Sequence, residues 1–266
     1  MILLSFDIEE FDMPLEYEKD ISFDDQIFIS TEGTNHILDI LDHHQVKATF
    51  FSTVVFAQNA PDVIKRINEG GHELASHAYF HSAFEPEHLA LSRKKLQEIS
   101  SQEISGFRMP RMMSVDENDV RKAGYKYNSS INPTWLPGRY NNLNKPRTLF
   151  KEAGIWQIPA SVSPILRFPL FWLSFHNLPI KVYQWLSERT YKKDGYLNIY
   201  FHPWEFTELG DQERFGFPGY VSRNSGKKMI ERMDLFIGNL KRKKYSFHSI
   251  SDFLKNCKQT AHLSNH

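Results

Sequence analysis

Short apolar runs alternate with longer amphipathic segments along most of the chain. Ile2–Ile8 is an apolar run rich in strand-forming residues and ends at acidic ones, which predicts a buried strand. After a polar, acidic stretch over residues 10–30, Thr31–His43 has apolar residues at the helical period and a capping residue in Thr31. Further strands are predicted at Val46–Phe51, His72–Ser76, Gly106–Pro110, Tyr196–Phe201 and Tyr245–Phe247, and further helices at Ala60–Gly70, Glu85–Ser100, Ser114–Ala123, Gly226–Asn239 and Ile250–Cys257.

This alternation of strands and helices predicts an α/β fold with a parallel sheet and helices packed outside it. In closed barrels and open sheets of this kind, functional groups lie at the carboxyl ends of the strands. Residues 132–186 break the pattern with seven prolines and many aromatic residues, and we interpret them as an irregular insertion over the core. We therefore expect one domain over residues 1–257, followed by a frayed polar tail over residues 258–266.

Composition narrows the class of protein. The chain has 266 residues, of which 41% are hydrophobic and 24% charged, as in a globular protein. Its 32 basic and 32 acidic residues cancel, which argues against a nucleic-acid binder. The single cysteine, Cys257, excludes an internal disulfide and a multi-cysteine metal site. The amino terminus lacks the pattern of a signal peptide and no run of about 18 apolar residues occurs, so we expect a cytoplasmic protein.

Two carboxylates and two histidines follow predicted strands. Asp7 and Glu9 alternate with Ile8, so on a strand both acids point to one side while Ile8 enters the packing. His77 and His81 are four positions apart, so on one helical turn both imidazoles face the same side. Each pair alone has an ordinary explanation, a solvated loop for the acids and a chance surface pair for the histidines. Together they form a two-histidine, one-carboxylate set with an open position, which a hydrolytic metal ion needs.

Arg108 and His202 follow two further predicted strands. Arg108 is placed to pair with a carboxylate and keep it ionised, although a lone arginine is more often an ordinary surface residue. His202 comes directly after an apolar strand, a position suited to a general acid. Trp204 offers a flat apolar face that stacks on a sugar ring or, more commonly, packs in a core.

These segments, in this order, resemble the polysaccharide deacetylase family, which is defined by the NodB homology domain and forms carbohydrate esterase family 4. The most specific part is Val46–Phe51 followed by a helix and then Gly71–His81. Phe201–Glu205 is similar to a subgroup with a His-Pro-Trp-Glu motif that is associated with exopolysaccharide synthesis. The likeness extends roughly over Leu3–Leu254 and implies a distorted, incomplete (β/α)7 barrel.

The resemblance also implies a role for each site residue. Asp7 matches the family's catalytic base, Arg108 the arginine that orients and charges that base, and His202 the histidine that protonates the leaving amine. His77 and His81 match the two metal-binding histidines. The ion is expected to be zinc or another divalent transition metal, because imidazole and carboxylate ligands suit these ions.

Two positions depart from the family's pattern. Ile8 stands where the metal-binding aspartate usually follows the base, and its side chain cannot bind a metal. Glu9 is therefore taken as the third ligand, with Asp12 as a reserve carboxylate. Asn128 stands where close relatives often have an aspartate, so any electrostatic help from this position is reduced.

The expected activity is removal of an N-acetyl group from an amino sugar in a poly- or oligosaccharide or its lipid-linked precursor. The backbone N–H after Tyr79 is expected near the oxyanion, and Tyr79, Pro110 and Trp204 are expected to contact the substrate. Two alternatives stay open. One is a hydrolase of another non-peptide C–N bond on the same fold, and the other is a saccharide-binding relative without catalysis, for which Ile8 and Asn128 are the motivation.

The apolar and aromatic segment Arg167–Phe175 invites comparison with a membrane-contacting surface. Packing over the barrel is the interpretation that we favour. A lipid-linked substrate would instead bring this segment to a bilayer surface.

Overall fold

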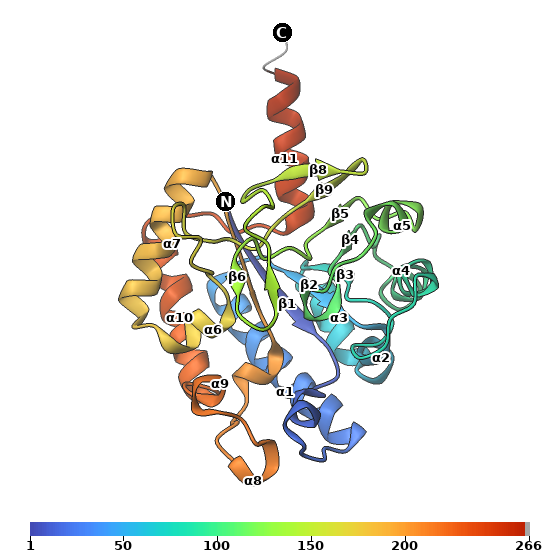
Figure 1. Cartoon of the computed structure of the whole chain (residues 1–266), viewed down its shortest axis with the longest axis vertical. Helices are drawn as coiled ribbons and strands as arrows, with labels where there is room; N and C mark the ends of the chain where they lie inside the picture. The colour runs from blue at the N-terminus through green and yellow to red at the C-terminus, as the bar shows by residue number, and fades with distance from the viewer. Residues whose placement is uncertain (264–266) are drawn as a thin grey trace.

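A computed structural model describes residues 1–263 of the chain. The centre of the molecule is one curled β-sheet (Figure 1). Six parallel pairings join seven strands in the order β10-β1-β2-β3-β4-β5-β9, and β8 pairs antiparallel with β9 at the edge. The strands are β1 (Ile2–Ile8), β2 (Thr49–Ser52), β3 (Glu73–Ser76), β4 (Gly106–Phe107), β5 (Tyr127–Asn128), β8 (Phe150–Glu152), β9 (Ile155–Gln157) and β10 (Leu197–Phe201). The predicted α/β fold with an incomplete barrel is confirmed.

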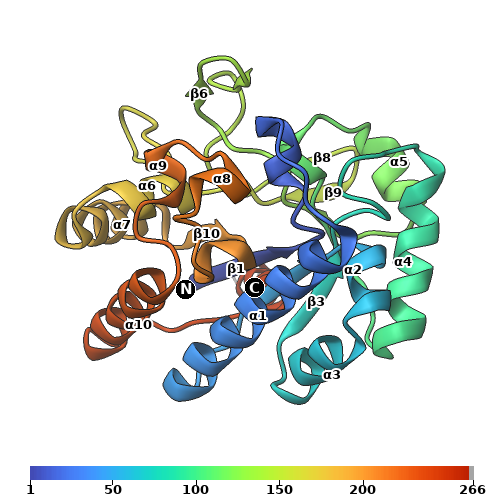
Figure 2. The same ribbon diagram turned by 90° about the horizontal axis from the view of Figure 1, so that it is seen from below.

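Helices surround the sheet, as Figure 2 shows for α1, α3, α4 and α10. The α-helices are α1 (Phe23–His44), α2 (Val54–Asn59), α3 (Pro61–Glu69), α4 (Glu87–Ser100), α5 (Glu117–Lys122), α6 (Trp172–Asn177), α7 (Ile180–Asp194), α8 (Gln212–Phe215), α9 (Gly219–Ser222), α10 (Lys227–Arg242) and α11 (Ile250–Leu263). Three 3-10 helices, η1 (Met13–Tyr17), η2 (Pro110–Met112) and η3 (Pro203–Phe206), and a hairpin of β6 (Trp135–Leu136) and β7 (Tyr140–Asn141) lie in the connections. Within residues 1–263, every helix is too short or too polar to cross a bilayer.

Strand β1 separates two sets of side chains. The main core under the helices takes its even-numbered residues, Ile2, Leu4, Phe6 and Ile8. Ser5 and Asp7 point the other way and contact Arg108. Each buried apolar side chain of this size contributes about 1.5–3 kcal/mol to folding, so the hydrophobic side of β1 fixes its register. The same register turns Asp7 toward the inside of the barrel.

The barrel has a seam between β9 and β10, which are not neighbours in the strand order. Asn198 of β10 donates from Nδ2 to the carbonyl oxygens of Ile158 and Pro159, each at 3.2 Å. Ser161 donates its backbone N–H to the Asn198 carbonyl at 2.8 Å and accepts the Asn198 N–H at its hydroxyl at 2.9 Å. The amide within an otherwise apolar strand therefore joins β10 to the segment that follows β9.

Helix α1 begins at Phe23, earlier than the predicted start at Thr31. Ser22 caps the helix by accepting the Asp25 N–H at 3.1 Å. Two acidic residues in the first turn also suit the positive end of the helix dipole. The acidic stretch that looked like a loop therefore contains the first two turns of the helix.

In the first half of the chain, the strands predicted at Val46–Phe51 and Gly106–Pro110 are Thr49–Ser52 and Gly106–Phe107, and helix α2 was not predicted. Further differences lie in the second half. Residues 132–186, predicted as an irregular insertion, contribute β8 and β9 to the main sheet as well as α6 and the start of α7. Around Tyr245–Phe247 the predicted strand is reduced to one isolated bridge with Ile2. Helix α11 continues beyond Cys257 to Leu263, so the predicted polar tail begins as helix, and residues 264–266 lie outside the described part of the chain.

Replacing Asn198 with alanine should lower the free energy of unfolding by about 1–3 kcal/mol, because the Pro159 carbonyl loses the donor that Asn198 supplies and the Ile158 carbonyl keeps only its bond from Ser129. Urea unfolding followed by circular dichroism measures the change. The matched control is Asn59→Ala, which removes a bond from an exposed amide to the Val55 carbonyl within α2 and should cost less than about 0.5 kcal/mol. Equal effects of the two variants would mean that the seam does not depend on Asn198.

Candidate metal-binding and catalytic site

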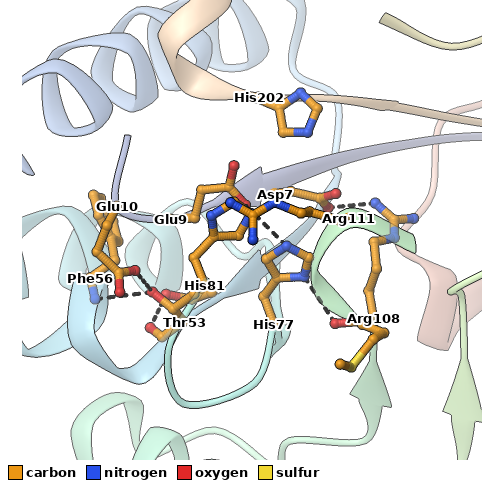
Figure 3. A network of polar contacts seen from close by, with 12 residues as sticks. Asp7, Glu9, Glu10, Thr53, Phe56, His77, His81, Arg108, Arg111 and His202 are labelled. Atoms are coloured by element: carbon orange, nitrogen blue, oxygen red, sulfur yellow. Dashed lines mark hydrogen bonds and ion pairs between the residues drawn. The ribbon is translucent and has the colours of Figure 1, made fainter. Parts of the chain in front are cut away.

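A cavity of about 260 Å³ opens beyond the carboxyl ends of β1 and β10. Six of the predicted site residues line it, namely Asp7, Glu9, His77, His81, His202 and Trp204. Figure 3 shows His202 on the opposite side of Glu9 from His77, and the Arg108 guanidinium beside Asp7. The structure thus brings together side chains from β1, from the loop after β3, from β4 and from the end of β10.

Glu9, His77 and His81 converge on one point of this cavity. Oε2 of Glu9 lies 3.0 Å from Nε2 of His77 and 3.1 Å from Nε2 of His81. The three side chains are buried, and their ligand atoms all lie within 4.8 Å of one another. This is the spacing that a single cation bound by three protein ligands requires.

Each histidine has its other ring nitrogen committed to an acceptor. Nδ1 of His77 lies 2.9 Å from the carbonyl oxygen of Arg108, and Nδ1 of His81 lies 2.8 Å from Oδ1 of Asp12. A carbonyl and an ionised carboxylate oxygen accept hydrogen bonds, so Nδ1 of each ring is the donor and Nε2 is the nitrogen that faces Glu9. A cation bound there would take the Nε2 lone pair of each ring and displace any proton on it. Oε2 of Glu9 is buried and has no hydrogen-bond donor among the described residues. Two ring nitrogens facing an unpartnered carboxylate oxygen fit a divalent cation.

Electrostatic interactions within this group shift the pKa values of Glu9 and His81. Burial alone raises the pKa of Glu9, but the charges of the surrounding histidines, that of His81 above all, outweigh it and lower the pKa to about 2. Burial alone lowers the pKa of His81, but the carboxylates of Glu9 and Asp12 outweigh it and raise the pKa to about 9. Glu9 is therefore ionised at neutral pH, as a metal ligand must be.

Asp7 and Arg108 form a buried ion pair, with Nη1 of the arginine 2.6 Å from Oδ1 of the aspartate. Other N–H groups of Arg108 donate to the carbonyl and hydroxyl of Ser129 and to the hydroxyl of Ser5, each at 3.0 Å. The guanidinium carbon lies 4.1 Å from the centroid of the Phe51 ring. Arg108 is fully buried, so the ordinary interpretation of a surface arginine is wrong, and the Asp7 carboxylate is fixed at the cavity wall.

His202 is held by a buried carboxylate to which sequence reasoning assigned no role. Nδ1 of His202 lies 3.0 Å from Oε1 of Glu205, which also accepts the His202 backbone N–H at 2.6 Å. Oε2 of Glu205 lies 2.9 Å from Nε2 of His176, whose Nδ1 donates to the Arg223 carbonyl at 2.6 Å. Glu205 thus fixes the ring of His202 and leaves Nε2 for the cavity.

The surroundings of His202 also favour its charged form. Burial lowers the pKa of His202, but the hydrogen bond to Glu205 and the carboxylates of Glu9 and Asp7 outweigh it, so the pKa is raised overall. A histidine with a raised pKa stays protonated to higher pH, as a proton donor should.

The rings of His77 and His81 lie together as predicted, but the backbone that positions them is not the predicted helical turn. Residues 77–81 form a loop after β3 and not a helical turn. Ala78 adopts a left-handed conformation with φ of 67°, and its carbonyl accepts the Val54 N–H at 3.2 Å. The loop is therefore held at the start of α2, and this attachment, not a helical period, orients the two rings.

The three residues predicted to contact the substrate do not present a free surface to the cavity. Tyr79 and Pro110 are not among the residues that line it, and Pro110 is buried. Trp204 lines the cavity but is 3% exposed, because His202 and Phe11 stack against its ring at centroid distances of 4.9 and 5.7 Å. Its predicted stacking on a sugar is therefore blocked, and Trp204 supports His202 from behind.

The two departures from the family pattern have different outcomes. Ile8 is buried in the main core, and Glu9 faces both histidines in its place. Asn128 donates to Glu117 at 2.8 Å and lies outside the cavity lining, so the missing charge there does not affect the cavity wall. Asp12, considered as a reserve ligand, instead orients His81 through Nδ1.

Aromatic side chains that sequence reasoning passed over also line the cavity. Tyr140 of β7, Trp172 of α6 and Tyr220 of α9 are among them, and Tyr220 is 54% exposed. Tyr140 and Trp172 belong to the irregular interval, where the sequence has no period from which a facing direction follows. These rings, and not Trp204, are the apolar surfaces available to a substrate.

Comparison with known proteins identifies related sequences. A family model described as polysaccharide deacetylase matches residues 20–127, a segment that contains His77, His81 and Arg108. A peptidoglycan-N-acetylglucosamine deacetylase from Bacillus cereus is 46% identical over 50 residues, or 19% of this chain and 18% of the relative. A chitin deacetylase from Arthroderma benhamiae is 30% identical over 130 residues, or 47% and 32%. The chain thus matches less than a third of the length of these relatives.

Solved structures share the fold over nearly the whole chain. A proposed polysaccharide deacetylase from Mycobacterium smegmatis has a TM-score of 0.67 at 17% identity and covers 98% of this chain and 90% of its own. The PuuE allantoinase has a TM-score of 0.62 at 16% identity, with 94% and 87% covered. A CE4 family pseudoenzyme from Bacillus anthracis has a TM-score of 0.52 at 14% identity, with 95% and 64% covered. At 14–17% sequence identity, these similarities show a shared fold alone.

The purified chain should bind one divalent transition-metal ion, measured by titration calorimetry with Zn²⁺ or Co²⁺. His77→Ala should abolish binding because a ligand is lost, and Asp12→Asn should weaken it by about 10–100-fold because His81 loses its orienting partner. The control is His44→Ala, from the exposed group His43, His44 and Asp234, which should leave the affinity unchanged. Loss of binding in the control variant alone would move the metal site to that group.

Proposed function

We propose that this chain, which carries a polysaccharide deacetylase domain, is a metal-dependent hydrolase that removes N-acetyl groups from an amino sugar of a saccharide. The observation that carries the proposal is the convergence of Glu9, His77 and His81 on one point of a cavity that Asp7 and His202 also line. Relatives with matching segments are named as deacetylases of peptidoglycan and chitin, which supports an amide of an amino sugar as the bond that is cleaved.

Glu9, His77 and His81 would hold the cation. A divalent cation, for which zinc suits these ligands best, supplies Lewis-acid polarisation of the amide carbonyl and a lowered pKa for coordinated water. Asp7 accepts the proton of the attacking water, because its carboxylate lines the cavity beside Glu9. Arg108 orients that carboxylate through the contact at 2.6 Å.

His202 then acts as the general acid. With Nδ1 held by Glu205, its Nε2 donates a proton to the departing nitrogen as the C–N bond breaks. The products are acetate and the free amine of the sugar. The carboxylates that raise the pKa of His202 keep it protonated for this step.

Two other activities compete with this proposal. The fold is shared with the PuuE allantoinase, so a different C–N bond is an alternative substrate, and a screen of N-acetylated oligosaccharides against small linear and cyclic amides separates the two. The fold is also shared with a pseudoenzyme, and a binding protein would retain saccharide binding without turnover. The complete set of Asp7, Arg108, Glu205 and His202 in hydrogen-bonding positions favours catalysis.

The variant Asp7→Asn should lower kcat for deacetylation of an N-acetylated oligosaccharide by about 10²–10⁴-fold, because an amide cannot accept the proton. Metal affinity should stay near that of the unaltered protein, since Asp7 is not among the three converging ligands. Release of acetate is the measurement. Turnover near the normal rate in Asp7→Asn would exclude Asp7 as the base.

The variant Glu205→Gln should move the alkaline limb of the kcat profile to lower pH. Glu205 raises the pKa of His202, and the acid form of His202 is the active one, so activity is lost as pH rises through that pKa. Without the carboxylate, the pKa falls and the loss begins earlier. Glu213→Gln, an exposed site on α8, is the control and should leave the profile unchanged. If Glu205→Gln lowers the maximal kcat but leaves the pH of the alkaline limb unchanged, Glu205 has a structural role alone.

A further inference from the structure

An exposed apolar surface stands beside the mouth of the cavity. It is formed by residues 133–145, which include the β6–β7 hairpin, and by the turn 163–168, and Figure 2 shows the hairpin projecting beyond its neighbours. We name this surface the apolar crest. Its large exposed side chains are Trp135 (60% exposed), Leu143 (46%), Ile165 (78%), Leu166 (86%) and Phe168 (38%).

Hydrogen bonds hold the two parts of the apolar crest together. The hydroxyl of Thr134 donates to the Arg167 carbonyl at 2.7 Å. In return, Nη1 of Arg167 donates to the carbonyls of Pro133 and Lys145 at 3.2 and 2.8 Å. These hydrogen bonds hold the exposed apolar side chains in place in water. Their exposure is unfavourable in free energy, and burial against a partner surface would remove that penalty.

The apolar crest is also cationic. Its two segments contain no acidic residue and three basic ones, Arg139, Lys145 and Arg167. The bias extends along the chain, because nine lysines and arginines but a single acid, Glu152, lie between Asp119 and Glu188, although the whole chain has no net charge. Arg139 and Lys145 have acidic neighbours at 3.8 and 3.6 Å, in partly exposed pairs of a kind that stabilises little and is easily exchanged.

We infer that the apolar crest docks the domain on an anionic lipid bilayer. Exposed Trp, Ile, Leu and Phe side chains partition into the headgroup and acyl boundary, while surrounding Arg and Lys side chains are attracted by anionic lipids. A protein partner would need acidic groups placed opposite each cation, whereas an anionic membrane supplies diffuse negative charge to all of them. The combination of apolar tips, basic flanks and no acid within the segments therefore fits a membrane surface.

Docking in this way would set the orientation of the cavity. Leu136, Pro137 and Tyr140 belong to the same hairpin and line the cavity, so the cavity mouth lies at the edge of the docked surface. The substrate then reached is an amino sugar joined to a lipid at the bilayer surface. This part rests on the proposed deacetylase function, whereas the docking itself does not.

The test is flotation of the full chain with vesicles of phosphatidylcholine alone and with vesicles that also contain phosphatidylglycerol. Binding should occur to the anionic vesicles and fall at high salt. The double variant Ile165→Ser with Leu166→Ser should bind about tenfold more weakly, because two of the most exposed apolar side chains are lost. The control is Leu91→Ser with Leu235→Ser, which removes side chains of 53% and 45% exposure from α4 and α10 and should bind normally.

Three outcomes would overturn the docking. The first is an absence of binding to anionic vesicles, and the second is equal binding by the crest variant and the control. The third is a change of oligomeric state in the crest variant, measured by ultracentrifugation. That change would assign the apolar crest to contact between copies of the chain. Acetate release from a soluble N-acetylated oligosaccharide is measured in parallel and should be unchanged in the crest variant. Asp7→Asn should float like the unaltered protein, so failure of catalysis and failure of docking are separately visible.

Discussion

The buried guanidinium of Arg108 connects the parts of the site. It sits inside the barrel, pairs with Asp7 at 2.6 Å, and donates to Ser5 of β1 and to Ser129, which directly follows β5. A buried charge destabilises a fold unless its hydrogen bonds are satisfied, and here β1 and the residue that follows β5 supply the acceptors. The backbone carbonyl of the same residue accepts from His77. One residue therefore fixes both the carboxylate proposed as the base and one of the proposed metal ligands.

The three histidines of the cavity follow a common arrangement. Each has Nδ1 bound to a fixed oxygen, from the Arg108 carbonyl for His77, from Asp12 for His81 and from Glu205 for His202. Each ring therefore presents Nε2 as its working nitrogen. The difference in chemistry comes from what Nε2 faces, since two rings face the carboxylate of Glu9 and the third faces open cavity.

The sequence predicts those parts of the site that depend on local periodicity. Alternation along β1 places Asp7 and Glu9 on one side because the apolar side chains must reach the core, and the structure agrees. His77 and His81 meet in a loop whose shape depends on Ala78 and on a bond to Val54, which no helical period describes. The role of Glu205 as the partner of His202 is not predictable from the sequence. It depends on the burial of Glu205 and on its contact with His176, and tertiary packing sets both. The contacts of His202 and Phe11 with the two ring faces of Trp204 are likewise a property of the packed core, which the sequence does not show.

The hydrogen bond between His77 and the main chain of Arg108 determines what a substitution at position 108 would change. A carbonyl oxygen is common to all twenty amino acids, so replacement of the guanidinium by another side chain deprives Asp7 of its partner without removing the acceptor that aims His77. The residues proposed to hold the cation and the pair proposed to move the proton can therefore change independently of each other. One substitution at Arg108 would then disable the proposed base and leave the three converging side chains in place.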